Sequence, residues 1–118
     1  MRGSSKTEKM PVLFIGHGSP MNIILENDFT NSLKRLGKSL PKPKAIMVVS
    51  AHWLTSGTRV TCMDKPTTIY DFYGFPGELY KIKYPSPGAP EYARMVERWV
   101  RRVPVYCDPG WGLDHAAW

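Results

Sequence analysis

The stretch PVLFIGHGSP, residues 11–20, decides the predicted fold class, because a short apolar run ends here on a histidine. A second stretch, AIMVVSAHW at residues 45–53, repeats this design with His52 at its end. Apolar runs of this length are typical of buried strands in an α/β sheet. Ligands gather at the carboxyl ends of the strands in such sheets. The pattern therefore predicts that His17 and His52 meet at one sheet edge as a candidate metal site.

The rest of the chain predicts an α/β domain with a mostly parallel sheet flanked by helices. Residues 28–38 carry apolar side chains at helical spacing, and a helix there makes the first two strands parallel through a right-handed crossover. A second helix is expected from Pro90, which suits a first helical position. Further strands are predicted over residues 59–63, 78–84 and 105–107.

Length and composition indicate one small domain, spanning residues 10–118, after a flexible polar tail at residues 1–9. The chain has 118 residues, of which 42% are hydrophobic, so a packed core is expected. The tail has no signal-peptide core, and no apolar run is long enough to cross a membrane. Cys62 and Cys107 lack metal-motif spacing. They are expected to be buried free thiols rather than a disulfide, with a cytoplasmic location.

The formal net charge of +6 raises the question of a nucleic-acid partner. Much of the positive charge lies in the tail and in residues 34–44 and 94–102, where it fits exposed helix faces. No nucleic-acid-binding motif accompanies it. A basic nucleic-acid-binding module is therefore the weakest of three functional hypotheses.

Three histidines, His17, His52 and His115, are the main candidates for chemistry. Imidazole is the commonest neutral metal ligand, and a catalytic metal site needs about three protein ligands plus an open position. The alternative is that each histidine is a capping or core residue bonded to backbone. Asp114 has two interpretations as well: it orients the neighbouring imidazole, or it caps a helix that starts at His115.

Two further features allow a catalytic and a structural interpretation. Ser19 follows His17 closely, but GHGSP is not a nucleophile elbow, so Ser19 is expected to cap or form a turn. The aromatic residues between 67 and 76 either line a pocket for an aromatic substrate or belong to the core.

Six motifs together resemble the 4,5-DOPA-extradiol-dioxygenase-like branch of the class III extradiol ring-cleavage dioxygenases. They occur in order as GHGSP (16–20), LPKPKAI (40–46), SAHW (50–53), TIYDFYGFP (68–76), YPSPGAP (84–90) and GLDH (112–115). The resemblance covers residues 10–118.

The resemblance implies an enzyme of aromatic compound metabolism that opens a catechol, such as a DOPA-like compound, with O2 and non-haem Fe(II). Some members carry zinc instead. His17 and His52 match two metal ligands of the family. His115 matches an active-site histidine that contacts substrate or bound oxygen. Neutral imidazoles hold a divalent iron while leaving positions for catecholate and O2, and a further imidazole exchanges protons with substrate.

The chain departs from the family in one respect. Members are longer, and their third metal ligand comes from the C-terminal half, so that ligand is expected to be absent from this chain. Asp71 and Glu78 are the weak local substitutes. We therefore expect a truncated domain with little activity alone and an exposed apolar edge that favours self-association. The alternative function is a non-enzymatic zinc-binding or assembly protein derived from the same family.

Overall fold

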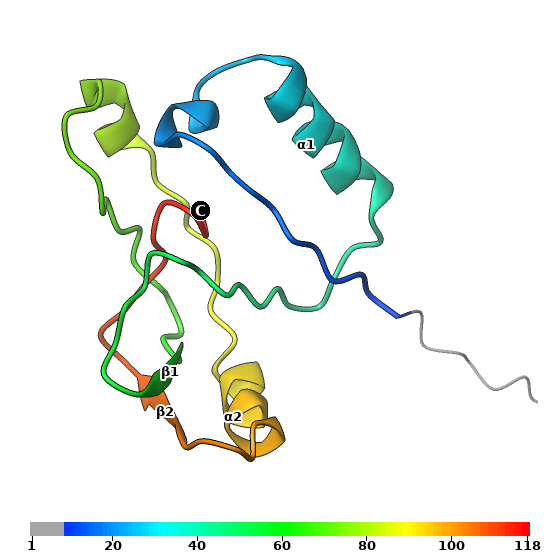
Figure 1. Ribbon diagram of the computed structural model, residues 1–118, viewed down its shortest axis with the longest axis vertical. Coiled ribbons are helices and arrows are strands. Elements are labelled where there is room, and N and C mark those ends of the chain that lie inside the picture. Colours follow the sequence, from blue (N-terminus) through cyan, green and yellow to red (C-terminus); the bar gives the residue numbers. More distant parts are fainter. Residues whose placement is uncertain (1–8) are drawn as a thin grey trace, which may run out of the picture.

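The computed structural model describes residues 9–118, and Figure 1 shows their arrangement. The expected tail at residues 1–9 lies outside the described residues except for Lys9. The elements, in chain order, are η1 (Pro20–Ile23), α1 (Asp28–Ser39), β1 (Thr58–Thr61), η2 (Gly77–Lys81), α2 (Pro90–Trp99) and β2 (Val105–Asp108). Both η elements are short 3-10 helices.

A parallel pair of strands with a helix packed beside it confirms the α/β fold class. β1 pairs with β2 in a register that runs from Thr58 opposite Val105 to Thr61 opposite Asp108. α2 connects them in the sequence and contacts both strands. Ala93 and Val105 are buried hydrophobic residues of this unit, and Leu79 of η2 is the third buried hydrophobic residue in residues 9–118. The strands predicted over 59–63 and 105–107 therefore exist, with shifts of one or two residues at their ends.

The two apolar segments that end on His17 and His52 run as extended chain but form no strand ladder within residues 9–118 (Figure 1). Val12 is 98% exposed, Phe14 103% and Val49 90%. A β-strand requires a neighbouring strand that hydrogen-bonds to it. Within residues 9–118, neither of these segments has such a neighbour. The predicted strands at these positions are therefore unpaired extended segments with open apolar surface.

The strand predicted over residues 78–84 is wrong: the chain forms η2 over the first half and no strand over residues 82–84. The turn begins at Pro76, whose carbonyl accepts a hydrogen bond from Leu79 N at 3.1 Å. Leu79 is fully buried, whereas Glu78 and Lys81 on the same turn are exposed. One buried apolar residue per turn stabilises a short helix here better than the alternating burial of a strand.

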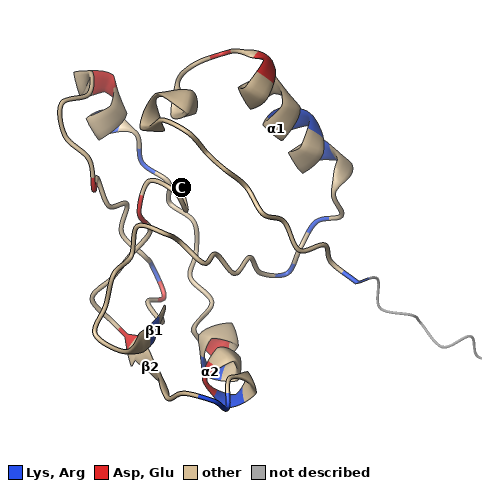
Figure 2. Ribbon diagram, viewed as in Figure 1, with Lys and Arg blue, Asp and Glu red and all other residues tan. Residues whose placement is uncertain are grey.

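Both predicted helices are present, and local signals set where they begin. At the start of α1, Asn27 Oδ1 accepts from Thr30 N at 2.9 Å and Thr30 Oγ1 accepts from Asn27 N at 3.0 Å. This reciprocal capping satisfies two N–H groups that the helix cannot pair internally. Pro90 occupies the first position of α2, as predicted. Figure 2 shows Lys and Arg positions on both helices, and these residues are exposed, as predicted for the helix faces.

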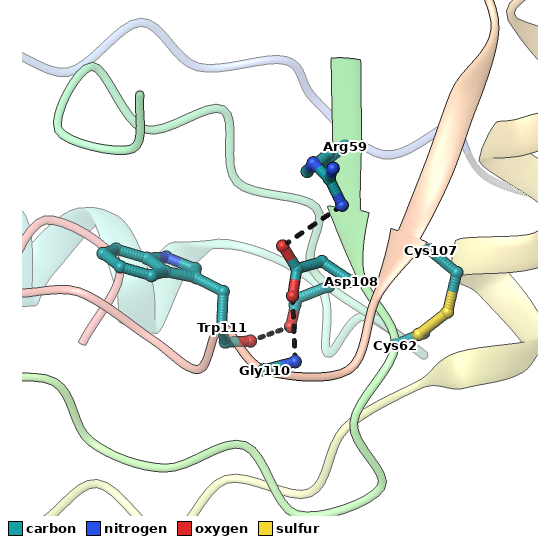
Figure 3. Close-up of a disulfide and its surroundings, with 7 residues drawn as sticks. Arg59, Cys62, Cys107, Asp108, Gly110 and Trp111 are labelled. Atoms are coloured by element: carbon teal, nitrogen blue, oxygen red, sulfur yellow. Dashed lines mark hydrogen bonds and ion pairs between the residues drawn. A yellow bond between two sulfur atoms is a disulfide. The ribbon is translucent and has the colours of Figure 1, made fainter. Parts of the chain in front are cut away.

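A disulfide joins Cys62 to Cys107 and contradicts the prediction of two free thiols (Figure 3). The Cα atoms lie 5.7 Å apart. The parallel register causes this proximity, because Cys107 lies opposite Val60 and Cys62 N donates to Asp108 O at 3.2 Å just beyond the strand. Cytosolic proteins rarely keep disulfides. The predicted cytoplasmic location stays a prediction.

Of the helices in residues 9–118, none has the length and apolar character that a membrane crossing requires.

Replacing Cys107 by serine should lower the free energy of unfolding by about 2–4 kcal/mol, because the bond closes a long loop in the unfolded chain. Urea unfolding monitored by circular dichroism, with and without reductant, measures the effect. Reductant should destabilise the wild type by a similar amount and leave the variant unchanged. Two thiols that react freely in the denatured, unreduced protein would contradict the disulfide.

Candidate metal centre

Three segments that are distant in the sequence bring His17, His52 and His115 together. One ligand nitrogen from each ring lies within 4.8 Å of the other two. The ring centroids are 5.0 Å apart for His17 and His52, 5.2 Å for His17 and His115, and 4.3 Å for His52 and His115. The structure therefore unites all three histidines that the sequence singles out.

The loop that carries His17 is held in place by its own backbone and by η1. Gly18 has a φ of +68°, a conformation that favours glycine. Asn22 donates from Nδ2 to the carbonyl oxygen of His17 at 2.9 Å. Ser19 caps η1 by accepting from Met21 N at 3.1 Å, which confirms its predicted capping role. These contacts fix the backbone of the turn that carries His17 and lead the chain directly into η1.

His52 faces His17 directly, with 2.9 Å between their Nε2 atoms. The backbone N–H of His52 donates to Ser50 Oγ at 3.1 Å. The next residue, Trp53, stacks on Trp111 with an interplanar angle of 3° and 5.6 Å between ring centroids. This stacking connects the segment of His52 with the segment that carries His115.

His115 reaches the cluster because its segment pairs with residues 67–69. Leu113 N donates to Thr67 O at 2.8 Å, and Leu113 O accepts from Ile69 N at 2.7 Å. Gly112 lies against Thr67 so closely that a side chain there would overlap its backbone. His115 is 8% exposed at the end of this bridge. Its burial differs from the exposed position of His52.

Asp114 caps a turn over residues 115–117, although the helix predicted to start at His115 is not formed. Its Oδ1 accepts from Ala116 N and Ala117 N, each at 3.1 Å, and the residue is 2% exposed. The carboxylate that contacts His115 is instead Asp71. Its Oδ1 accepts from His115 N at 2.9 Å and lies 2.9 Å from His115 Nδ1. Sequence reasoning missed this contact because 44 residues separate the two side chains.

The contacts with His115 also set the charge state of Asp71. Burial alone raises the pKa of this carboxyl, but the hydrogen bond from the His115 backbone and the close His115 ring together lower it by more. The pKa of Asp71 therefore lies below its ordinary value of 3.8, and the group is a carboxylate at neutral pH.

Aromatic side chains from the 67–76 stretch surround the buried side of the cluster. Phe72 meets His115 edge-on, with ring centroids 5.8 Å apart, and also contacts Tyr80 and Trp118. Trp118 donates from Nε1 to Ile69 O at 2.9 Å. Tyr73, in contrast, is 92% exposed. Phe72 of this stretch thus packs in the aromatic cluster and also borders the His115 ring.

The nitrogen arrangement fits a divalent metal ion. Two imidazoles that bind one ion at about 2.1 Å in neighbouring octahedral positions have nitrogens about 3.0 Å apart. The His17 and His52 Nε2 atoms lie 2.9 Å apart, a distance that a hydrogen bond between the two rings explains in the metal-free chain and that is also compatible with this spacing. Within residues 9–118, neither Asp71 nor Glu78 belongs to the group of mutually close ligand atoms. The predicted carboxylate substitutes are therefore not part of the cluster.

Comparison with known proteins gives one family for the chain. The family model for the catalytic LigB subunit of aromatic ring-opening dioxygenase matches residues 10–118. The chain is 51% identical to 4,5-DOPA dioxygenase extradiol of Escherichia coli (strain K12), covering 93% of this chain and 41% of that protein. It is 42% identical to 4,5-DOPA dioxygenase extradiol of Beta vulgaris, covering 89% of this chain and 41% of that protein. The chain thus spans about 41% of the length of these relatives.

Replacing Gly112 by alanine should destabilise the protein by about 1–3 kcal/mol, because the new methyl group would overlap the Thr67 backbone. Chemical unfolding measures the loss. Gly110→Ala is the matched control, since its added carbon would meet only Asp108 Oδ1 at an ordinary 3.5 Å. Equal stability of the two variants would show that the 67–69 segment does not constrain Gly112.

Proposed function

This chain belongs to the family of the catalytic LigB subunit of aromatic ring-opening dioxygenases, and from this premise we propose that it carries the metal-binding and proton-transferring histidines of an extradiol dioxygenase. The substrates would be catechols, opened with O2 at a non-haem Fe(II) ion. The observation that supports this function most strongly is the convergence of His17, His52 and His115.

His17 and His52 are the proposed ligands of the ion. Their Nε2 atoms face each other across a distance that two ligands of one ion would have. Bound Fe(II) would supply the site where a catecholate and O2 exchange electrons. The two histidines lie at the ends of extended segments, and neutral imidazoles leave the ion its positive charge to attract a catecholate oxygen.

His115 is the proposed acid–base residue. It is 8% exposed and packs against the edge of Phe72, which shields it from bulk water. Imidazole exchanges protons readily near neutral pH, so His115 can accept a proton from a catechol hydroxyl and return it later. Its position beside His17 and His52 places this exchange next to the metal ligands.

A DOPA-like catechol is the proposed substrate class. The E. coli and Beta vulgaris relatives are both named 4,5-DOPA dioxygenases extradiol. In this chain, Phe72 and its aromatic neighbours border His115 and offer ring edges to a planar substrate.

A zinc-binding or assembly protein is the second candidate function. Three imidazoles without a carboxylate also suit Zn²⁺. The exposed apolar side chains of residues 12–15 and 46–49 would suit self-association.

Removing either proposed ligand should weaken metal binding. Loss of a group that merely orients a ligand costs about 10–100-fold in affinity, so His17→Ala and His52→Ala should each lower Zn²⁺ or anaerobic Fe²⁺ affinity by more than that. Isothermal titration with the metal salts measures this. His115→Ala is the matched control, because it removes an imidazole from the same cluster and should change affinity far less. Unaltered affinity in all three variants would eliminate the site.

Ring cleavage distinguishes the two candidate functions. The Fe²⁺-loaded chain, mixed at stoichiometric concentration with L-DOPA and O2, should form a yellow semialdehyde slowly. His115→Ala should abolish the product while the bound iron remains, because only proton transfer is lost. Absorption spectra and iron analysis report both quantities. Tight Zn²⁺ binding with no ring-opened product from the iron-loaded chain would favour the non-enzymatic function, whereas fast multiple turnover would contradict the expected low activity.

A further inference from the structure

We propose that Asp71 is a positioning residue that fixes the orientation and tautomer of His115, so that Nδ1 carries the proton and Nε2 presents its lone pair to the catalytic site. The catalytic consequence rests on the acid–base role proposed for His115. The orientation itself stands on geometry that does not depend on a metal or a substrate.

One oxygen of Asp71 contacts His115 at two points. Oδ1 accepts from the backbone N–H at 2.9 Å and lies 2.9 Å from ring Nδ1. The first contact fixes the main chain of His115, and the second limits rotation of its ring. The His115 side chain is 6% exposed and that of Asp71 17% exposed, so the imidazole side of the contact is sheltered, whereas Asp71 as a residue is exposed to water.

The carboxylate selects one tautomer. The contact is short but bent: Nδ1 of His115 does not meet hydrogen-bond geometry with any described residue, although Asp71 Oδ1 is 2.9 Å away. Because Nδ1 is buried and this oxygen lies 2.9 Å away, the negative charge of Asp71 favours a proton on Nδ1. With a proton on Nδ1, the ring attracts the carboxylate. Without it, a lone pair would face a negative oxygen.

Chain topology explains why these two residues meet. Thr68 and Leu113 form a parallel bridge, and Ile69 N donates to Leu113 O. Asp71 lies two residues beyond Ile69, and His115 lies two residues beyond Leu113. Because both chains advance in the same direction, the bridge delivers the two side chains to the same place.

The fixed tautomer suits the proposed chemistry. A neutral histidine accepts a proton only through a nitrogen that has a free lone pair. With Nδ1 committed to Asp71, Nε2 is the nitrogen available to a catechol hydroxyl. The carboxylate then stabilises the imidazolium that forms, as carboxylate partners of functional histidines commonly do.

Nitrogen-15 NMR of the metal-free chain tests the proposal without any activity. The His115 signals, assigned by their loss in His115→Ala, should show a pyrrole-type Nδ1 and a pyridine-type Nε2 at neutral pH. Asp71→Ala should move both nitrogens toward the averaged values of an unconstrained imidazole. Asp71→Asn preserves size and a backbone acceptor, so it should fold like wild type and produce a smaller shift in the same direction.

Asp114→Asn is the control, because Asp114 is the carboxylate next to His115 in the sequence and it bonds to Ala116 N and Ala117 N rather than to the His115 ring. It should leave the ring signals in place. The proposal is overturned by a wild type with its proton on Nε2, by Asp71 variants with unshifted signals, or by an equal shift in Asp114→Asn. Since no metal is added, a chain that fails to bind Fe²⁺ would refute the proposed function without affecting this result.

Discussion

The hydrogen bonds of Leu113 with Thr67 and Ile69 are the constraint on which the candidate site depends. They place the C-terminal segment beside the aromatic stretch, with Gly112 close enough to Thr67 to exclude any side chain. This bridge buries His115 and sets Asp71 beside it. Without the bridge, His17 and His52 would be a pair of exposed imidazoles with no third partner.

A second set of contacts connects that bridge to the strand pair. Trp53 stacks on Trp111, and the hydroxyl of Thr61, the last residue of β1, donates to the Trp111 carbonyl. An ion pair joins the two strands, with 3.8 Å between Arg59 Nη1 and Asp108 Oδ2. The Cys62–Cys107 disulfide lies beside it (Figure 3). The exposed ion pair contributes little to stability. The disulfide and the stacked indoles are the contacts that hold this end of the chain in register.

Local patterns predicted the features that depend on local physics. The α1 helix, the Pro90 start of α2 and the cap at Ser19 all follow from short stretches of sequence. The meeting of His17 with His52 was predicted from neighbouring strand ends, yet unpaired extended segments bring the two rings together. The strands at residues 12–15 and 45–50 required neighbours, which no local pattern reveals. The disulfide and the Asp71 contact both depend on the register between segments more than 40 residues apart. Register arises from tertiary packing, so the sequence alone could not predict either pairing.

X-ray absorption spectroscopy of the metal-loaded chain tests the central claim most directly, because it counts the groups bound to the ion. The account predicts two imidazole nitrogens at about 2.1 Å, with oxygen from water or buffer in the other positions. His17 and His52 would supply them, and the His115→Ala variant would give the same spectrum. A spectrum with no imidazole scattering, or one in which His115→Ala removes an imidazole, would contradict the assignment of the two ligands.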